Sequence, residues 1–184
     1  MSTFLSRDFL TSATPLLVVK FFAPTFPDTQ NGVPPYTAGE QVRYWSLCTN
    51  EPLTTAVSRC VPDDRAATQN GYTTIVISDP SNQPSASVLS QWGATWLAWG
   101  AMEYSTDFLY NMNYQPLAST DGAFYYSVLI YRQTLASSSF TQSMANVSKL
   151  PPSQRKAAMG AYWPVSGYCT AAQFQSAGAG CIGH

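Results

Sequence analysis

The sequence contains few charged residues, and this scarcity excludes one large class of partner. Charged side chains make up 10% of the 184 residues, against about 25% in an average soluble domain. Nine Lys and Arg against ten Asp and Glu give a formal net charge of −1. The basic residues are scattered, and only Arg155 and Lys156 are adjacent. Because a nucleic-acid-binding surface needs clustered Lys and Arg, we expect no nucleic-acid partner.

Histidine is almost absent, which removes the commonest catalytic and metal-binding arrangements. The single His is the last residue, His184. A Ser–His–Asp or Cys–His nucleophile needs a His in a structured position, which a chain end does not provide. No C-x-x-C spacing occurs, and the glycines do not form a phosphate-binding loop. We therefore expect neither a metal site nor a cofactor.

Long apolar runs are missing as well. The longest run, residues 16–19, is interrupted by Lys20, far short of the roughly 18 residues that a membrane-spanning helix needs. Residues 1–10 contain Arg7 and Asp8 and lack the apolar region of a signal peptide. The chain is therefore expected to have no membrane span, and it is either cytosolic or a protein from which a leader has been removed.

The four cysteines favour the removed leader. Cys48 and Cys60 lie 12 positions apart and flank a turn-rich segment, and Cys169 and Cys181 lie 12 positions apart near the end. Two such local pairs are typical of a two-disulfide domain in an oxidising compartment. We predict the disulfides Cys48–Cys60 and Cys169–Cys181 and a secreted, periplasmic or cell-surface location. Four buried free thiols are the alternative.

The first three quarters of the chain are patterned as short strands separated by turns. β-Branched and aromatic residues alternate or form short runs, bounded by Asn-Gly, Asp-Gly and Pro. We expect a mainly β fold, an antiparallel, jelly-roll-like β-sandwich in a single domain at 1–184. The predicted strands are residues 16–22, 42–48, 54–61, 72–78, 95–99 and 123–132.

Residues 139–184 change to helical patterning, so we expect short C-terminal helices. Residues 139–142 (Ser-Phe-Thr-Gln) fit a capping box that opens an amphipathic helix. A second helical turn is predicted at 153–159, after two prolines. Residues 170–173 (Thr-Ala-Ala-Gln) fit another capping box, whose helix should end near Gly178.

Four motifs in fixed order resemble a known group of proteins. They are Arg-Tyr-Trp-Ser-Leu-Cys at 43–48, Gly-Tyr-Thr-Thr-Ile-Val-Ile-Ser-Asp-Pro at 71–80, Trp-Leu-Ala-Trp-Gly at 96–100 and Ile-Tyr-Arg-Gln-Thr-Leu at 130–135. Together they resemble the C-terminal half of an uncharacterised family of secreted bacterial β-sandwich proteins. The resemblance implies a secreted sandwich and implies no reaction. Relative to that family, this chain inserts roughly residues 101–120.

The inserted segment is rich in aromatic and apolar residues and carries only two charges. A loop of this length and composition either folds over its own domain or is covered by a partner. Because interfaces are enriched in Tyr and Met, we predict that it contacts a partner. The predicted binding residues are Tyr104, Phe108, Tyr110, Met112 and Tyr114, together with Trp92 and Trp99 outside the loop.

Three classes of function remain open. The first is a non-catalytic secreted or envelope module, a structural or assembly subunit that docks on other protein chains or on copies of itself. The second is a carbohydrate-binding module with Trp and Tyr as platforms. The third is a secreted hydrolase that uses carboxylates, for which Glu103 and Asp107 are weak candidates as acid and base. Exposed Trp rings would favour sugar binding, and carboxylates facing each other across a cleft would favour the hydrolase.

Overall fold

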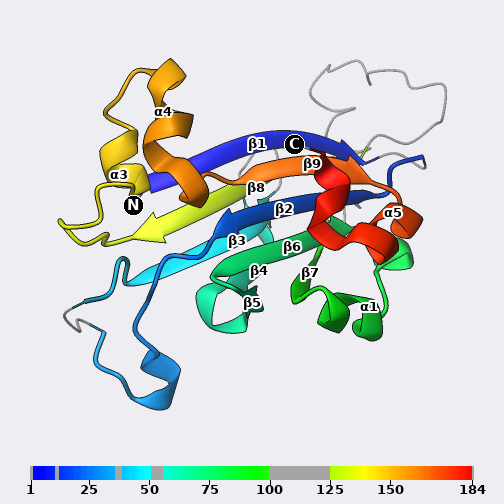
Figure 1. Ribbon diagram of the computed structural model, residues 1–184, viewed down its shortest axis with the longest axis horizontal. Helices are drawn as coiled ribbons and strands as arrows, with labels where there is room; N and C mark the ends of the chain where they lie inside the picture. Colours follow the sequence, from blue (N-terminus) through cyan, green and yellow to red (C-terminus); the bar gives the residue numbers. More distant parts are fainter. Residues whose placement is uncertain (1, 11–12, 36–38, 51–55, 100–124, 184) are drawn as a thin grey trace.

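The computed structural model describes residues 2–10, 13–35, 39–50, 56–99 and 125–183, and it describes side chains from residue 10 to 99 and from 128 onward within those ranges (Figure 1). The strands form two sheets, and the helices are short. The prediction of a mainly β fold is therefore confirmed.

The first sheet has four antiparallel strands in the order β1-β8-β3-β4. Their bounds are β1 Ser2–Leu10, β8 Tyr125–Thr134, β3 Tyr44–Asn50 and β4 Val57–Pro62. The predicted strands at 42–48, 54–61 and 123–132 correspond to β3, β4 and β8. Strand β1 was not predicted; it pairs with β8 along its whole length, from Ser2 opposite Gln133 to Leu10 opposite Tyr125.

The second sheet has five strands in the order β5-β6-β2-β9, with β7 also paired to β6. Their bounds are β2 Leu16–Phe22, β5 Thr68–Gln69, β6 Tyr72–Ser78, β7 Ala94–Ala98 and β9 Val165–Cys169. The pairs in this sheet are antiparallel except one, because β7 runs parallel to β6. The connection between them contains two short helices and is long enough to return the chain to the same end of the sheet, as parallel pairing requires.

The two sheets share one apolar core, as the layers of a β-sandwich do. Strand β2 contributes Leu17, Val19 and Phe21 to this core, and β3 and β8 contribute Trp45 and Tyr131 from the other sheet. The ring of Phe21 lies 5.2 Å from that of Trp45, edge to face, and 4.7 Å from that of Tyr131. Such pairs add to the burial of apolar area, so these three rings hold the layers together.

The helices lie at two opposite ends of the sheets (Figure 1). One end carries α3 (Met144–Val147), α4 (Pro152–Met159) and the 3-10 turn η4 (Gly160–Tyr162). The other end carries α1 (Ala86–Gln91), α5 (Ala171–Ala177) and η5 (Gly178–Ile182). Three further 3-10 turns are η1 (Thr29–Asn31), η2 (Asp63–Arg65) and η3 (Pro80–Asn82).

One of the two predicted capping boxes is present. At α5 the Thr170 hydroxyl accepts the backbone N–H of Gln173, whose side chain in turn accepts the N–H of Thr170. The box predicted at 139–142 is wrong, because the helix begins later and Ser143 caps it. Ser143 is buried and accepts the N–H of Asn146, so the buried hydroxyl supplies the cap that the sequence pattern placed one turn earlier.

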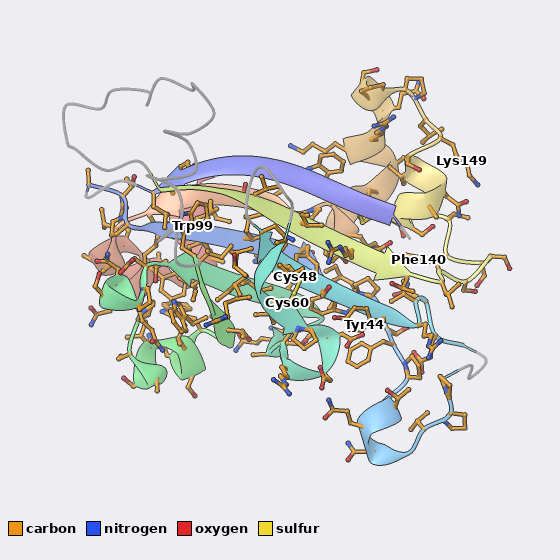
Figure 2. All side chains as sticks on the ribbon, turned by 180° about the vertical axis from the view of Figure 1, so that it is seen from behind. Tyr44, Cys48, Cys60, Trp99, Phe140 and Lys149 are labelled. Carbon is orange, nitrogen blue, oxygen red and sulfur yellow. A yellow bond between two sulfur atoms is a disulfide. The ribbon has the colours of Figure 1, made fainter. Side chains whose placement is uncertain are left out.

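Both predicted disulfides are present, and all four cysteines are accounted for. Cys48 and Cys60 are directly opposite each other on β3 and β4 (Figure 2). Cys169, the last residue of β9, forms the second disulfide with Cys181 in η5. The alternative of four free thiols is excluded, and the two bridges are consistent with an oxidising environment outside the cytoplasm.

Candidate functional site

The predicted interaction loop at 101–120 lies outside the residues that the structure describes. Its role in docking therefore stays a prediction. The same holds for the weak acid and base candidates, Glu103 and Asp107. The loop residues concerned are Tyr104, Phe108, Tyr110, Met112 and Tyr114.

The two tryptophans predicted to bind a ligand lie in different environments. Trp99 is 2% exposed and belongs to the central core, so in this structure it offers no ring face to a ligand. Trp92 is half-buried beside α1 and α5, and its indole N–H donates to the carbonyl of Gln175 at 3.2 Å. Trp92 lines a groove, described below, and remains a candidate.

A groove of about 640 Å³ lies at one end of the first sheet, and we call it the loop groove. One wall is the irregular segment that carries η1, and the other is formed by η2 and the first residue of β3, Tyr44. The Tyr44 side chain is 37% exposed and lies beside that segment (Figure 2). The lining residues are 26–30, 32–35, Arg43, Tyr44, Asp63, Asp64 and Thr134.

Hydrogen bonds at both ends hold the first wall in place. At its base, Thr25 and Gln41 exchange bonds: the Thr25 N–H donates to Gln41 Oε1 and the Gln41 N–H donates to Thr25 Oγ1, each at 3.0 Å. The Gln41 amide also donates to the Tyr162 hydroxyl at 2.6 Å. At the tip, Gln30 donates to the carboxylate of Asp64 across the groove. The wall is therefore tied to η4 and to η2.

The three carboxylates of the loop groove accept hydrogen bonds from other groups of the protein, Asp64 from Gln30 as described above. Asp28 caps η1 by accepting the N–H of Asn31 at 3.2 Å. Asp63 is 7% exposed and accepts the backbone N–H groups of Trp45 at 3.0 Å and Asp64 at 2.9 Å. Burial raises the pKa of Asp63, and the two backbone bonds oppose that rise. Each carboxylate thus has a structural role.

A second groove of about 360 Å³ lies on the outer face of the second sheet, and we call it the sheet groove. Its floor comes from β2 and β6, where Lys20 is directly opposite Thr74. The ammonium of Lys20 lies 4.9 Å from the centre of the Tyr72 ring. The lining residues are Lys20, Gln69, Asn70, Tyr72, Thr74, Trp92, Ala177, Ala179 and Gly180.

Neither groove is evident from the sequence alone. Asn31-Gly32 and Asn70-Gly71 are turn signals in the sequence, but a turn signal does not indicate ligand binding. The reason is that each groove joins segments that are far apart in the chain. Residues 69–74 and 177–180, for example, meet only because α5 and η5 fold over β2 and β6.

No known protein family, curated protein or solved structure matches this chain. The resemblance to secreted bacterial sandwich proteins therefore stays a prediction. Within the described ranges, no helix is long and apolar enough to cross a membrane. The same ranges hold no group of three or more His, Cys, Asp or Glu residues placed to bind a metal ion.

Proposed function

We propose that this chain is a non-catalytic, secreted or cell-surface binding module that holds an extended segment of another protein in the loop groove. The observation that carries the proposal is the pairing of an exposed aromatic side chain, Tyr44, with a preformed wall that is rich in proline. The two disulfides support a location outside the cytoplasm.

The apolar part of the loop groove fits a polypeptide. Phe26, Val33 and Tyr44 line it together with three prolines, at positions 27, 34 and 35. Tyr and Phe are enriched at the centres of protein interfaces. A volume of about 640 Å³ lies within the range of about 300–1,000 Å³ that is usual for ligand sites. The groove can thus accommodate several side chains of an extended segment.

The first wall of the loop groove should lose little conformational entropy when a ligand binds. Each proline has a fixed φ, and the bonds at Gln41 and Gln30 already hold the segment at its base and tip. Since ordering of loops opposes association, a preformed wall favours affinity.

The charge around the loop groove indicates the kind of segment. Asp28, Asp63 and Asp64 line it, and among its described lining residues Arg43 is the single basic one. Complementary charge speeds association and selects partners. We therefore propose that the bound segment carries Lys or Arg. Because all three carboxylates already accept hydrogen bonds within the protein, we assign them no catalytic role.

A peptide selection tests this function. Short random peptides displayed on phage are selected against the intact chain, and the enriched peptides are synthesised and measured by fluorescence anisotropy. Tyr44→Ala should weaken their binding by about tenfold or more, as expected for a central aromatic anchor. Tyr168→Ala is the matched control, because Tyr168 has a similar exposure, 39%, and lies on β9 outside the groove.

The acidic lining of the loop groove is tested in the same experiment. Raising the salt concentration should weaken the binding of the same peptides, because salt screens charge pairs, and the enriched sequences should contain Lys or Arg. Peptides that bind Tyr44→Ala as well as they bind the wild type would overturn the proposal, and so would a selection that enriches no peptide.

A further inference from the structure

We propose that the sheet groove is a separate binding site for an acidic saccharide, with Lys20 as the group that binds the anion. This inference goes beyond the proposed function, because the site lies on the other sheet and shares no lining residue with the loop groove.

The alternation of β2 places Lys20 on the outer face of the second sheet. Leu17, Val19 and Phe21 point into the central core, whereas Leu16 and Val18 belong to a second cluster on the outer face. Phe174 of α5 and Ile182 of η5 pack against that second cluster. Lys20 follows Val18 on the same face and lines the sheet groove beside this cover.

Among the described residues that line the sheet groove, Lys20 is the one charged residue, and none carries a carboxylate. The Lys20 ammonium lies 4.9 Å from the centre of the Tyr72 ring, a cation–π distance. An ammonium has three N–H donors, and contact with one ring face does not occupy all of them. The remaining donors can therefore bind an anion. A groove with one cation and no carboxylate favours a negatively charged ligand.

The aromatic walls are held rigidly. The indole of Trp92 donates to the Gln175 carbonyl, and Gly178 lies directly against its ring, where an added Cβ would be 2.5 Å from the nearest ring atom. Tyr72 makes an edge-to-face contact with Phe22 at 5.1 Å. Rings held in this way line the groove and need no ordering when a ligand binds.

The rest of the lining supplies groups that can bind hydroxyls. Gln69 and Asn70 present exposed amides at the turn between β5 and β6, and Thr74 contributes a hydroxyl from β6. Amides and hydroxyls both donate and accept, which matches the hydroxyls of a sugar. The volume of about 360 Å³ is at the lower end of the range for small-ligand sites, about 300–1,000 Å³, and suits a short saccharide.

A glycan array tests the site with the intact chain. The array carries uronic-acid oligomers, sialylated glycans and sulfated glycans, each beside its neutral counterpart. We expect binding to acidic members and at least about tenfold weaker binding to their neutral counterparts. Lys20→Gln should reduce the acidic signal by about tenfold or more, whereas Lys20→Arg should retain most of it. The matched control is Lys156→Gln, an exposed lysine on α4.

A second variant separates loss of binding from loss of folding. Asn70 has a φ of +52°, so Asn70→Gly removes the amide at a position whose backbone glycine adopts readily. It should weaken saccharide binding and leave the thermal midpoint within a few degrees of the wild type.

Three results would overturn the inference: no binding to any acidic glycan, equal binding by Lys20→Gln, or competition by inorganic sulfate alone with no preference among sugars. Tyr44→Ala should leave glycan binding unchanged, so the two proposals fail separately.

Discussion

The carboxylate of Asp63 accepts the backbone N–H of Trp45 at 3.0 Å and so ties the turn after β4 to the start of β3. Asp63 also accepts the N–H of Asp64 at 2.9 Å, and its side chain is buried. The residue thus fixes one wall of the loop groove to the strand that carries Tyr44.

We predict that Asp63→Asn destabilises the fold, more strongly at acidic pH. The amide can accept only one of the two backbone N–H groups, and leaving the other unpaired should lower the free energy of unfolding by about 1–3 kcal/mol at pH 7. Burial raises the pKa of Asp63 above its ordinary value of 3.8. The folded chain therefore binds this proton more tightly than the unfolded chain does.

The sign of the pH dependence follows from that difference in proton binding. The stability that protonation of Asp63 contributes is complete below pH 3.8, the ordinary value, and is lost as the pH rises through the raised pKa. The gap in unfolding free energy between wild type and Asp63→Asn should therefore widen as the pH is lowered from 7. Urea denaturation across this range measures it, with Asp64→Asn as the control that keeps both bonds of Asp63. A gap that narrows towards acid would contradict the prediction.

The disulfides predict a defined pattern of alkylation and a loss of stability on removal. Under denaturing, non-reducing conditions intact-mass measurement should show no uptake of iodoacetamide, since no cysteine is free. Replacing Cys169 and Cys181 together by Ser should lower the free energy of unfolding by about 3 kcal/mol, the chain-entropy value for so short a loop. An unchanged urea midpoint would show that the bridge adds nothing to stability.

Gln133 should be among the most sensitive polar positions of the core. It is 2% exposed, its amide donates to the Tyr131 hydroxyl at 3.1 Å, and its carbonyl accepts the Met144 N–H at 2.9 Å. Gln133→Leu leaves the Tyr131 hydroxyl and the Met144 N–H without these partners. We therefore expect the free energy of unfolding to fall by about 2–4 kcal/mol. The control, Gln142→Leu, removes one hydrogen bond, from a half-buried side chain to the Met159 carbonyl. It should lower the free energy of unfolding by less than Gln133→Leu does. Equal thermal midpoints for the two variants would argue against a special role of Gln133.

Gly178 should not tolerate a side chain. Its φ is +53°, and an added Cβ would lie 2.5 Å from the Trp92 ring. Gly178→Ala should therefore lower the free energy of unfolding by more than the roughly 1–2 kcal/mol that a positive φ alone costs a residue with a Cβ. It should also shift the tryptophan fluorescence. Gly180→Ala is the matched control, because among the described residues an added Cβ there would meet Ala177 alone, at an ordinary contact distance of 3.7 Å. If both alanine variants melted at the wild-type temperature, the packing of Gly178 against Trp92 would be unimportant for stability.

The patterns that predicted structure correctly are those that depend on neighbours in the chain. The run at 16–22 and the alternation at 72–78 coincide with β2 and β6, because strand residues alternate between two faces whatever lies beyond them. The box at Thr170 and Gln173 closes within one helical turn. The equal spacing of the cysteines likewise reflects pairing within short loops.

The start of α3 shows how a tertiary contact overrides a local signal. Both Ser139 and Ser143 are good capping residues by sequence. Ser143 is the cap in the structure, next to Met144, whose N–H is bound by Gln133 of β8. A strand on another part of the chain thus supplies a partner at the first turn of this helix, which no pattern within residues 139–147 could indicate.

The sequence by itself determined the β-rich fold class, most strand positions and both disulfides, since each depends on residues close in the chain. Only the tertiary structure decided the strand β1, the parallel pairing of β7, the burial of Trp99 and the two grooves. In each of these cases the deciding contacts join residues far apart in the chain. Lys20 and Tyr44 became candidate binding residues because packing left them lining a groove, and each groove joins segments that are far apart in the chain.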